Sequence, residues 1–134
     1  MRRVVVWIGC ISVSLVAIAF AMLANAASDL FLQVQAPRPW IALIICPVGL
    51  VASFLLTRHF FPGAQGSGIP QVIATQHIED RTLIARILSP RIAAGKIALT
   101  LLGLASGASI GREGPTVQVG ACIMHVVARM LRLP

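Results

Sequence analysis

Two short segments rich in glycine and proline carry the residue types that bind small anions. They are Gly66-Ser67-Gly68-Ile69-Pro70 and Gly111-Arg112-Glu113-Gly114-Pro115. The closing proline favours the first turn of a helix, where its missing N–H would have no partner. A helix that begins inside a membrane exposes unpaired N–H groups and about half a positive charge. Two such helix starts directed at one place would form a cradle for an anion.

Glu113 is the strongest single candidate for chemistry. A charged side chain near the bilayer centre costs on the order of 2.5–3.5 kcal/mol, so an acid at that depth points to ion handling. Its carboxylate can occupy the cradle as a substitute anion. Burial would favour its neutral form, whereas the helix start and Arg112 would favour the charged form. Protonation would then free the cradle and couple anion passage to a proton. The alternative is a structural Arg112–Glu113 pair.

Ser67 adds a hydroxyl donor at the first helix start. The alternative is an ordinary serine N-cap, whose oxygen accepts a hydrogen bond from the backbone. Backbone N–H groups and a hydroxyl can satisfy a chloride-sized anion without a lysine, whose full charge would hold the anion too tightly for release.

The composition places the chain in a bilayer. It is 57% hydrophobic and only 11% charged, and its mean hydropathy is +0.90. The 11 Lys and Arg residues exceed the 4 Asp and Glu residues, but they stand at the ends of apolar runs and form no dense patch with interleaved aromatics. They indicate membrane topology, and no nucleic-acid partner is expected.

The cysteines and histidines do not form a metal or disulfide pattern. No CxxC or HExxH spacing occurs among Cys10, Cys46, Cys122, His59, His77 and His125. No nucleophile with a matching base and no phosphate-binding loop is evident either. The sequence therefore predicts no enzyme, no metal site and no cofactor.

The N-terminal half predicts two membrane spans. Val4 to Ser28 is an uncharged run long enough for a spanning helix, which needs about 20 residues. A cleaved signal peptide is the alternative, because Ala24-Asn25-Ala26 matches the small-residue cleavage pattern. Asp29 to Pro39 predicts an external loop. Trp40 to Thr57 predicts a second span, interrupted by Pro47.

The C-terminal half predicts shorter pieces. A half-helix should begin at Pro70, and Glu79 to Lys96 has soluble character with a break at Ser89-Pro90. The run from Ile97 to Gly111 covers only about 22 Å at about 1.5 Å per residue, which is too short to span a bilayer untilted. Gly114 to Ala128 is equally short. These two runs should go partly outward and return.

The positive-inside rule orients these segments. The Arg112-Glu113 turn should lie toward the outer half of the membrane. The N-terminus and all basic clusters should be cytoplasmic, namely Arg2 and Arg3, Arg58, Arg81 to Lys96, and Arg129 with Arg132. The expected fold is all-α, with multiple transmembrane helices and broken half-helices. Residues 1–134 would form a single partial domain, the N-terminal part of a larger protein.

Together the two turns resemble those of the voltage-gated chloride channel (CLC) family of channels and proton/chloride antiporters. They begin 45 residues apart, and the second continues as Thr116-Val117-Gln118-Val119-Gly120-Ala121. The resemblance implies that Ser67 contacts chloride and that Glu113 is the gating glutamate that carries the proton. It also implies that the remaining residues shape the two anion-facing helix starts: Gly66, Gly68, Ile69 and Pro70 in the first, and Gly111, Arg112, Gly114 and Pro115 in the second.

The resemblance favours proton-coupled chloride exchange gated by Glu113. A passive chloride channel and a membrane fragment without transport are the alternatives. The implied partners are chloride, protons, the lipid bilayer and, in the full-length protein, a second copy forming a homodimer. The implied location is a bacterial inner membrane.

The chain also departs from the family pattern. Gln71 stands where many relatives carry glutamate, and the chain contains no tyrosine to coordinate chloride. The third anion-binding motif (GxFxP), the internal proton-transfer glutamate and the main dimer-forming helices have no counterpart here. The 134 residues are therefore expected to hold only part of the pore.

Overall fold

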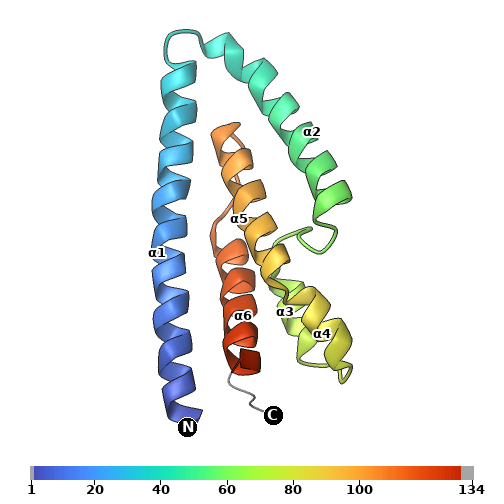
Figure 1. Cartoon of the computed structure of the whole chain (residues 1–134). Helices are drawn as coiled ribbons and strands as arrows, with labels where there is room; N and C mark the ends of the chain where they lie inside the picture. The colour runs from blue at the N-terminus through green and yellow to red at the C-terminus, as the bar shows by residue number, and fades with distance from the viewer. Residues whose placement is uncertain (1, 131–134) are drawn as a thin grey trace.

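The computed structural model describes residues 2–130 as helices joined by short connections (Figure 1). Arg132, from the last predicted basic cluster, lies outside the described residues. No strand occurs within residues 2–130, which confirms the all-α class. The elements are α1 (Arg2–Gln35), η1 (Pro39–Ile41), α2 (Ala42–Phe60), α3 (Ile69–Thr75), α4 (Arg81–Ile87), α5 (Pro90–Ala105) and α6 (Glu113–Met130).

Within residues 2–130, three stretches are long and apolar enough to cross a membrane. They are Val6–Gln35, Pro39–Phe60 and Thr82–Ala105. The first two correspond to the predicted spans. Pro47 lies inside α2 without ending it, as membrane helices tolerate proline better than soluble ones.

The predicted loop from Asp29 to Pro39 was mostly wrong. α1 continues through Gln35, and only residues 36–38 separate it from η1. The segment from Asp29 to Gln35 contains neither glycine nor proline, so nothing in it breaks the helix. Pro37 is the first residue that cannot continue the backbone hydrogen bonding.

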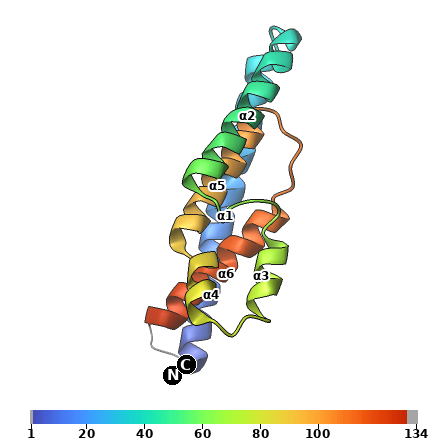
Figure 2. The same cartoon turned by 90° about the vertical axis from the view of Figure 1, so that its right-hand side faces the viewer.

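α1, α5 and α6 pack against one another at the centre of the contacts, with α1 along one side of the molecule (Figures 1 and 2). Phe20 and Ala24 of α1 are buried in this packing. α2 slants away from the centre and approaches α5 at Gly49, where a Cβ atom would lie only 1.9 Å from Ser106 Oγ. In both views α1 begins and α6 ends at the same end of the molecule.

The predicted break at Ser89-Pro90 is confirmed as the start of α5. Ser89 is the N-cap, and its side-chain oxygen accepts a hydrogen bond from the Ile92 amide at 3.3 Å. The prediction of a soluble segment extending to Lys96 was wrong. Lys96 is only 3% exposed and lies within α5, because the helix continues past it into the interior.

The connection between α5 and α6 is longer than expected. α5 ends at Ala105, six residues before Gly111. Gly107 has a φ of 81°, a left-handed conformation that side chains disfavour, so the helix stops there. The chain then returns toward the middle of the molecule before α6 begins (Figure 2). α6 therefore starts at mid-height rather than at an end.

Asp80 caps α4, and its contribution to stability should depend on pH. Its Oδ1 accepts hydrogen bonds from Thr82 Oγ1 at 2.7 Å and Thr82 N at 2.8 Å, which lower the pKa of the carboxyl below 3.8. A lowered folded-state pKa stabilises the fold above the unfolded-state pKa, and this stabilisation is lost as pH falls through the folded-state value.

We therefore expect Asp80→Ala to lower the melting temperature at neutral pH and to differ less from the original protein in strong acid. Asp80→Asn is the control, because it can still cap the helix without titrating. Thermal unfolding in detergent across this pH range measures the difference. A constant gap between Asp80→Ala and the original protein would contradict the expectation.

Candidate functional site

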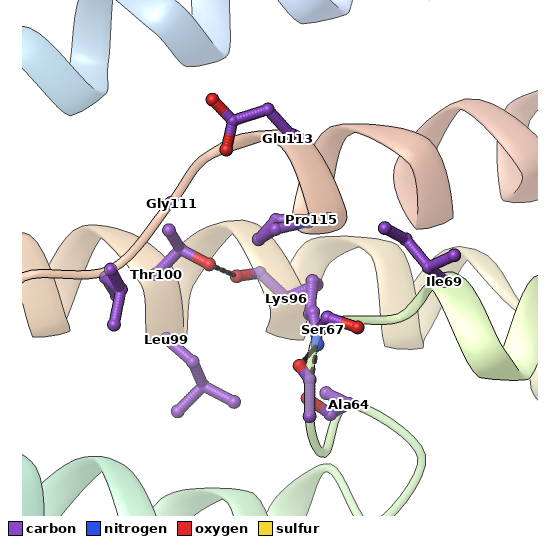
Figure 3. A pocket seen from close by; sticks show the side chains of 12 residues that line it. Ala64, Ser67, Ile69, Lys96, Leu99, Thr100, Gly111, Glu113 and Pro115 are labelled. Carbon is purple, nitrogen blue, oxygen red and sulfur yellow. Dashed lines mark hydrogen bonds between the residues drawn. The ribbon is translucent and has the colours of Figure 1, made fainter.

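The two glycine-proline turns line one cavity of about 500 Å³. Ser67 from the first turn and Glu113 from the second both contribute to its wall, together with Lys96 and Thr100 of α5. Figure 3 shows these residues around the cavity. The structure thus brings together the two residues that the sequence analysis singled out.

The first turn depends on two glycines in left-handed conformations. Gly66 has a φ of 66° and Gly68 a φ of 91°. A Cβ atom at Gly68 would lie 2.5 Å from Gln118 Oε1. Gln118 is fully buried, and its Nε2 donates to the Gly63 carbonyl at 3.3 Å. This glutamine, to which the sequence analysis gave no role of its own, therefore packs against the first turn.

Gln71 also bonds the first turn. Its Nε2 donates to the Gln65 carbonyl oxygen at 2.8 Å. A glutamate at this position has no amide N–H to donate, so it could not form this bond in its ionised state. The departure from the family pattern at Gln71 is therefore matched by a specific contact in this chain.

The two turns touch each other at Gly114. A Cβ atom at this position would lie 2.5 Å from the Ser67 carbonyl oxygen and 3.0 Å from Ser67 Cβ. Any side chain at Gly114 would therefore push the turns apart. The second glycine-proline segment needs glycine here for close approach, not for an unusual backbone angle.

Ser67 does not cap α3. The N-cap is Gly68, and no side-chain hydrogen bond caps the helix within the described part of the chain. The alternative of an ordinary serine cap was therefore wrong. Ser67 is exposed and its side chain lies at the cavity wall, where the hydroxyl can donate to a ligand.

Lys96 lines the cavity, a position that the sequence analysis did not predict. Its Nζ donates to the Ala64 carbonyl oxygen at 2.8 Å and also to the Gly66 carbonyl oxygen. These two carbonyl dipoles oppose part of the ammonium charge. The available signal was its isolation: Lys96 is the only charged residue between Ile92 and Gly111.

Glu113 is the first residue of α6 and is exposed at the cavity. In Figure 3 its carboxylate points away from Ser67 and Lys96. Among residues 2–130, no ion pair joins it to Arg112. Arg112 Nη1 instead donates to Asn25 Oδ1 of α1 at 2.6 Å. The alternative of a structural Arg112–Glu113 pair was therefore wrong, and Asn25 is a second residue that the sequence analysis missed.

Sequence comparisons connect this site with known proteins. The family model described as voltage gated chloride channel matches residues 48–134, a range that includes both turns. The H(+)/Cl(-) exchange transporter ClcA of Vibrio vulnificus is 32% identical over 95 residues, covering 70% of this chain and 19% of that protein. The putative chloride channel protein ClcB-like of Ralstonia nicotianae is 35% identical over 96 residues, covering 70% of this chain and 21% of that protein.

A plant protein is also similar to this chain. The chloride channel protein CLC-c of Arabidopsis thaliana is 40% identical over 78 residues, covering 58% of this chain and 10% of that protein. No solved structure matches the chain. The chain spans about a fifth of the length of the bacterial relatives. The resemblance inferred from the two turns is confirmed, and the chain belongs to the voltage-gated chloride channel family.

Proposed function

We propose that this chain supplies the anion-binding part of a chloride transporter and that Glu113 is its proton-linked gate. The observation that carries the proposal is the shared cavity of Ser67 and Glu113, at which α3 and α6 both begin. The names of the bacterial relatives, which include an H(+)/Cl(-) exchange transporter, support chloride and protons as the transported ions.

The donors around the cavity suit an anion that must also leave. The Ser67 hydroxyl and the backbone N–H groups at the starts of α3 and α6 provide partial positive charge. Lys96 adds a full charge, but its ammonium is held by the Ala64 and Gly66 carbonyls. Chloride would therefore bind to oriented dipoles in front of a lysine that is already partnered, which moderates its affinity.

Glu113 can compete with chloride for the same cavity. When ionised, its carboxylate is an acceptor for the N–H groups that would otherwise bind the anion. When protonated, it releases them. On protonation the side chain would rotate out of the cavity to the position seen in Figure 3, and chloride could then enter. One proton would thus be bound each time the cavity opens to chloride.

The proposed setting is an inner bacterial membrane with the N-terminus in the cytoplasm. The ends of α1 and α6 that lie together carry Arg3 and Arg129, which favours the cytoplasm for that end. A homodimer of the full-length protein is part of the same proposal.

The test is chloride flux through the purified protein in liposomes as a function of pH. We expect Glu113→Gln, which cannot titrate, to abolish the pH dependence of the flux. Glu79→Gln is the matched control, because Glu79 is an exposed acid away from the cavity wall. An unchanged pH profile in Glu113→Gln would refute the gating role.

The same liposomes distinguish an exchanger from a passive channel. A chloride gradient should drive protons in the opposite direction through the original protein and not through Glu113→Gln. Chloride flux without proton movement in the original protein would favour the passive channel. The absence of chloride flux would favour the fragment without transport.

A further inference from the structure

Arg112 reaches from the second turn to α1. Its Nη1 donates to Asn25 Oδ1 at 2.6 Å and lies 3.5 Å from the Ala21 carbonyl oxygen. Ala21 and Asn25 are one helical turn apart and share a face of α1. One stretch of this helix therefore offers two acceptors to a single guanidinium.

α1 also contacts the connection that leads into the second turn. The Phe31 ring covers Gly107, where a Cβ atom would lie 2.2 Å from Phe31 Cζ. This contact is near the beginning of the segment from residue 106 to 112, and the Asn25–Arg112 bond is at its end. α1 thus supports the segment before Glu113 at two separate points.

The Asn25 contact determines where the charge of Arg112 lies. Arg112 precedes Glu113 directly, and a guanidinium at membrane depth needs partners because its isolated charge is costly there. The amide oxygen of Asn25 satisfies one N–H group without adding an opposing charge. The guanidinium is therefore held on α1, and no ion pair with Glu113 forms in the described part of the chain.

We propose that Asn25 is a positioning residue for the Glu113 gate. By holding the guanidinium of Arg112 on α1, it prevents an ion pair that would keep Glu113 ionised and immobile. This inference rests on the proposed function of Glu113. The other charged group at the cavity is Lys96 of α5; α1 carries the exposed Asp29 one turn beyond Asn25, and α3 carries no charged residue.

Two substitutions at Asn25 should move the pH midpoint of chloride flux in opposite directions. Asn25→Leu releases Arg112, which can then pair with Glu113 and stabilise its ionised form, so the midpoint should fall by about half a pH unit. Asn25→Asp retains Arg112 and adds a negative charge, so the midpoint should rise. Ser14→Leu is the control for an apolar substitution at an exposed position of α1; its midpoint should not move.

The effect should require Arg112. In an Arg112→Leu background, Asn25→Leu should leave the midpoint unchanged, because no guanidinium remains to be released. Equal shifts with and without Arg112, or shifts of the same sign for Asn25→Leu and Asn25→Asp, would overturn the positioning role.

Failure of the proposed function gives a different result. If Glu113→Gln retains the pH dependence of the original protein, the gate itself is refuted and Asn25 loses the role assigned to it. If Glu113→Gln removes the pH dependence and Asn25→Leu has no effect on the midpoint, only the positioning role is refuted. A double-mutant cycle of unfolding free energies for Asn25 and Arg112 supplies a measurement without flux; zero coupling would also overturn the inference.

Discussion

Replacing Lys96 by methionine is expected to weaken chloride binding at least about tenfold. Lys96 lines the same cavity as Ser67 and Glu113, and a cavity of 500 Å³ is about 10 Å across if spherical. Two unit charges about 10 Å apart attract by about 1.7 kcal/mol at an effective dielectric constant of about 20. Loss of that attraction corresponds to a roughly 15-fold weaker affinity.

The effect of this substitution on stability should be smaller than its effect on binding. Methionine leaves the Ala64 and Gly66 carbonyls without their ammonium donor, which costs about 1–3 kcal/mol per buried group. It also removes a buried charge, whose desolvation costs several kcal/mol. These effects oppose each other, so the melting temperature should fall less than the loss of the two hydrogen bonds alone would predict.

Isothermal titration with chloride and thermal unfolding in detergent measure the two quantities separately. Arg91→Met is the matched control, because Arg91 is an exposed cation on the same helix, bonded to the Phe60 carbonyl oxygen at 3.3 Å. We expect it to leave chloride affinity nearly unchanged. Equal affinities for Lys96→Met and the original protein would show that Lys96 serves only to hold the first turn.

Gly114→Ala is expected to destabilise the protein by about 1–3 kcal/mol, the range for forced overpacking. The added Cβ would lie 2.5 Å from the Ser67 carbonyl oxygen. This neighbour is backbone, so it cannot rotate away as a side chain can. The two turns must separate, and the Ser67 hydroxyl moves relative to the start of α6. Chloride affinity should fall together with stability.

Gly120→Ala is the control for adding one methyl group to the same helix. Its Cβ would meet only Val13 Cγ1, at 3.3 Å, which is a side-chain atom that can adjust. Alanine favours a helix over glycine by up to about 1 kcal/mol, so this variant should be neutral or slightly stabilised. Chemical unfolding of both variants gives the comparison, and equal effects would contradict the close approach of the two turns.

The local features of the fold could be predicted from the sequence. Pro70, Pro90 and Pro115 each lie in the first turn of a helix, because proline favours that position whatever surrounds it. The error at Asp29 to Pro39 has the same local origin. One acid, one base and two prolines were interpreted as a loop over the whole segment, although nothing before Pro37 prevents a helix.

The partners of long side chains could not be predicted in this way. The alternative interpretation paired Arg112 with its sequence neighbour Glu113, yet Arg112 bonds Asn25, 87 residues earlier. Lys96 was assigned to a soluble segment, yet it donates to carbonyls about 30 residues away. Hydropathy is an average over neighbouring residues in the sequence. It therefore does not distinguish a lysine whose ammonium reaches water from one whose ammonium bonds buried carbonyls.

The sequence by itself determined the helix starts, the membrane setting and the family, since these depend on residue types and spacing along the chain. Only the tertiary structure decided that the two turns share a cavity, that Gly114 is their point of contact and that Arg112 bonds Asn25 of α1. Those features depend on which helices lie side by side. The physical reason is that a long cationic side chain at membrane depth bonds whichever acceptors the packing brings within reach.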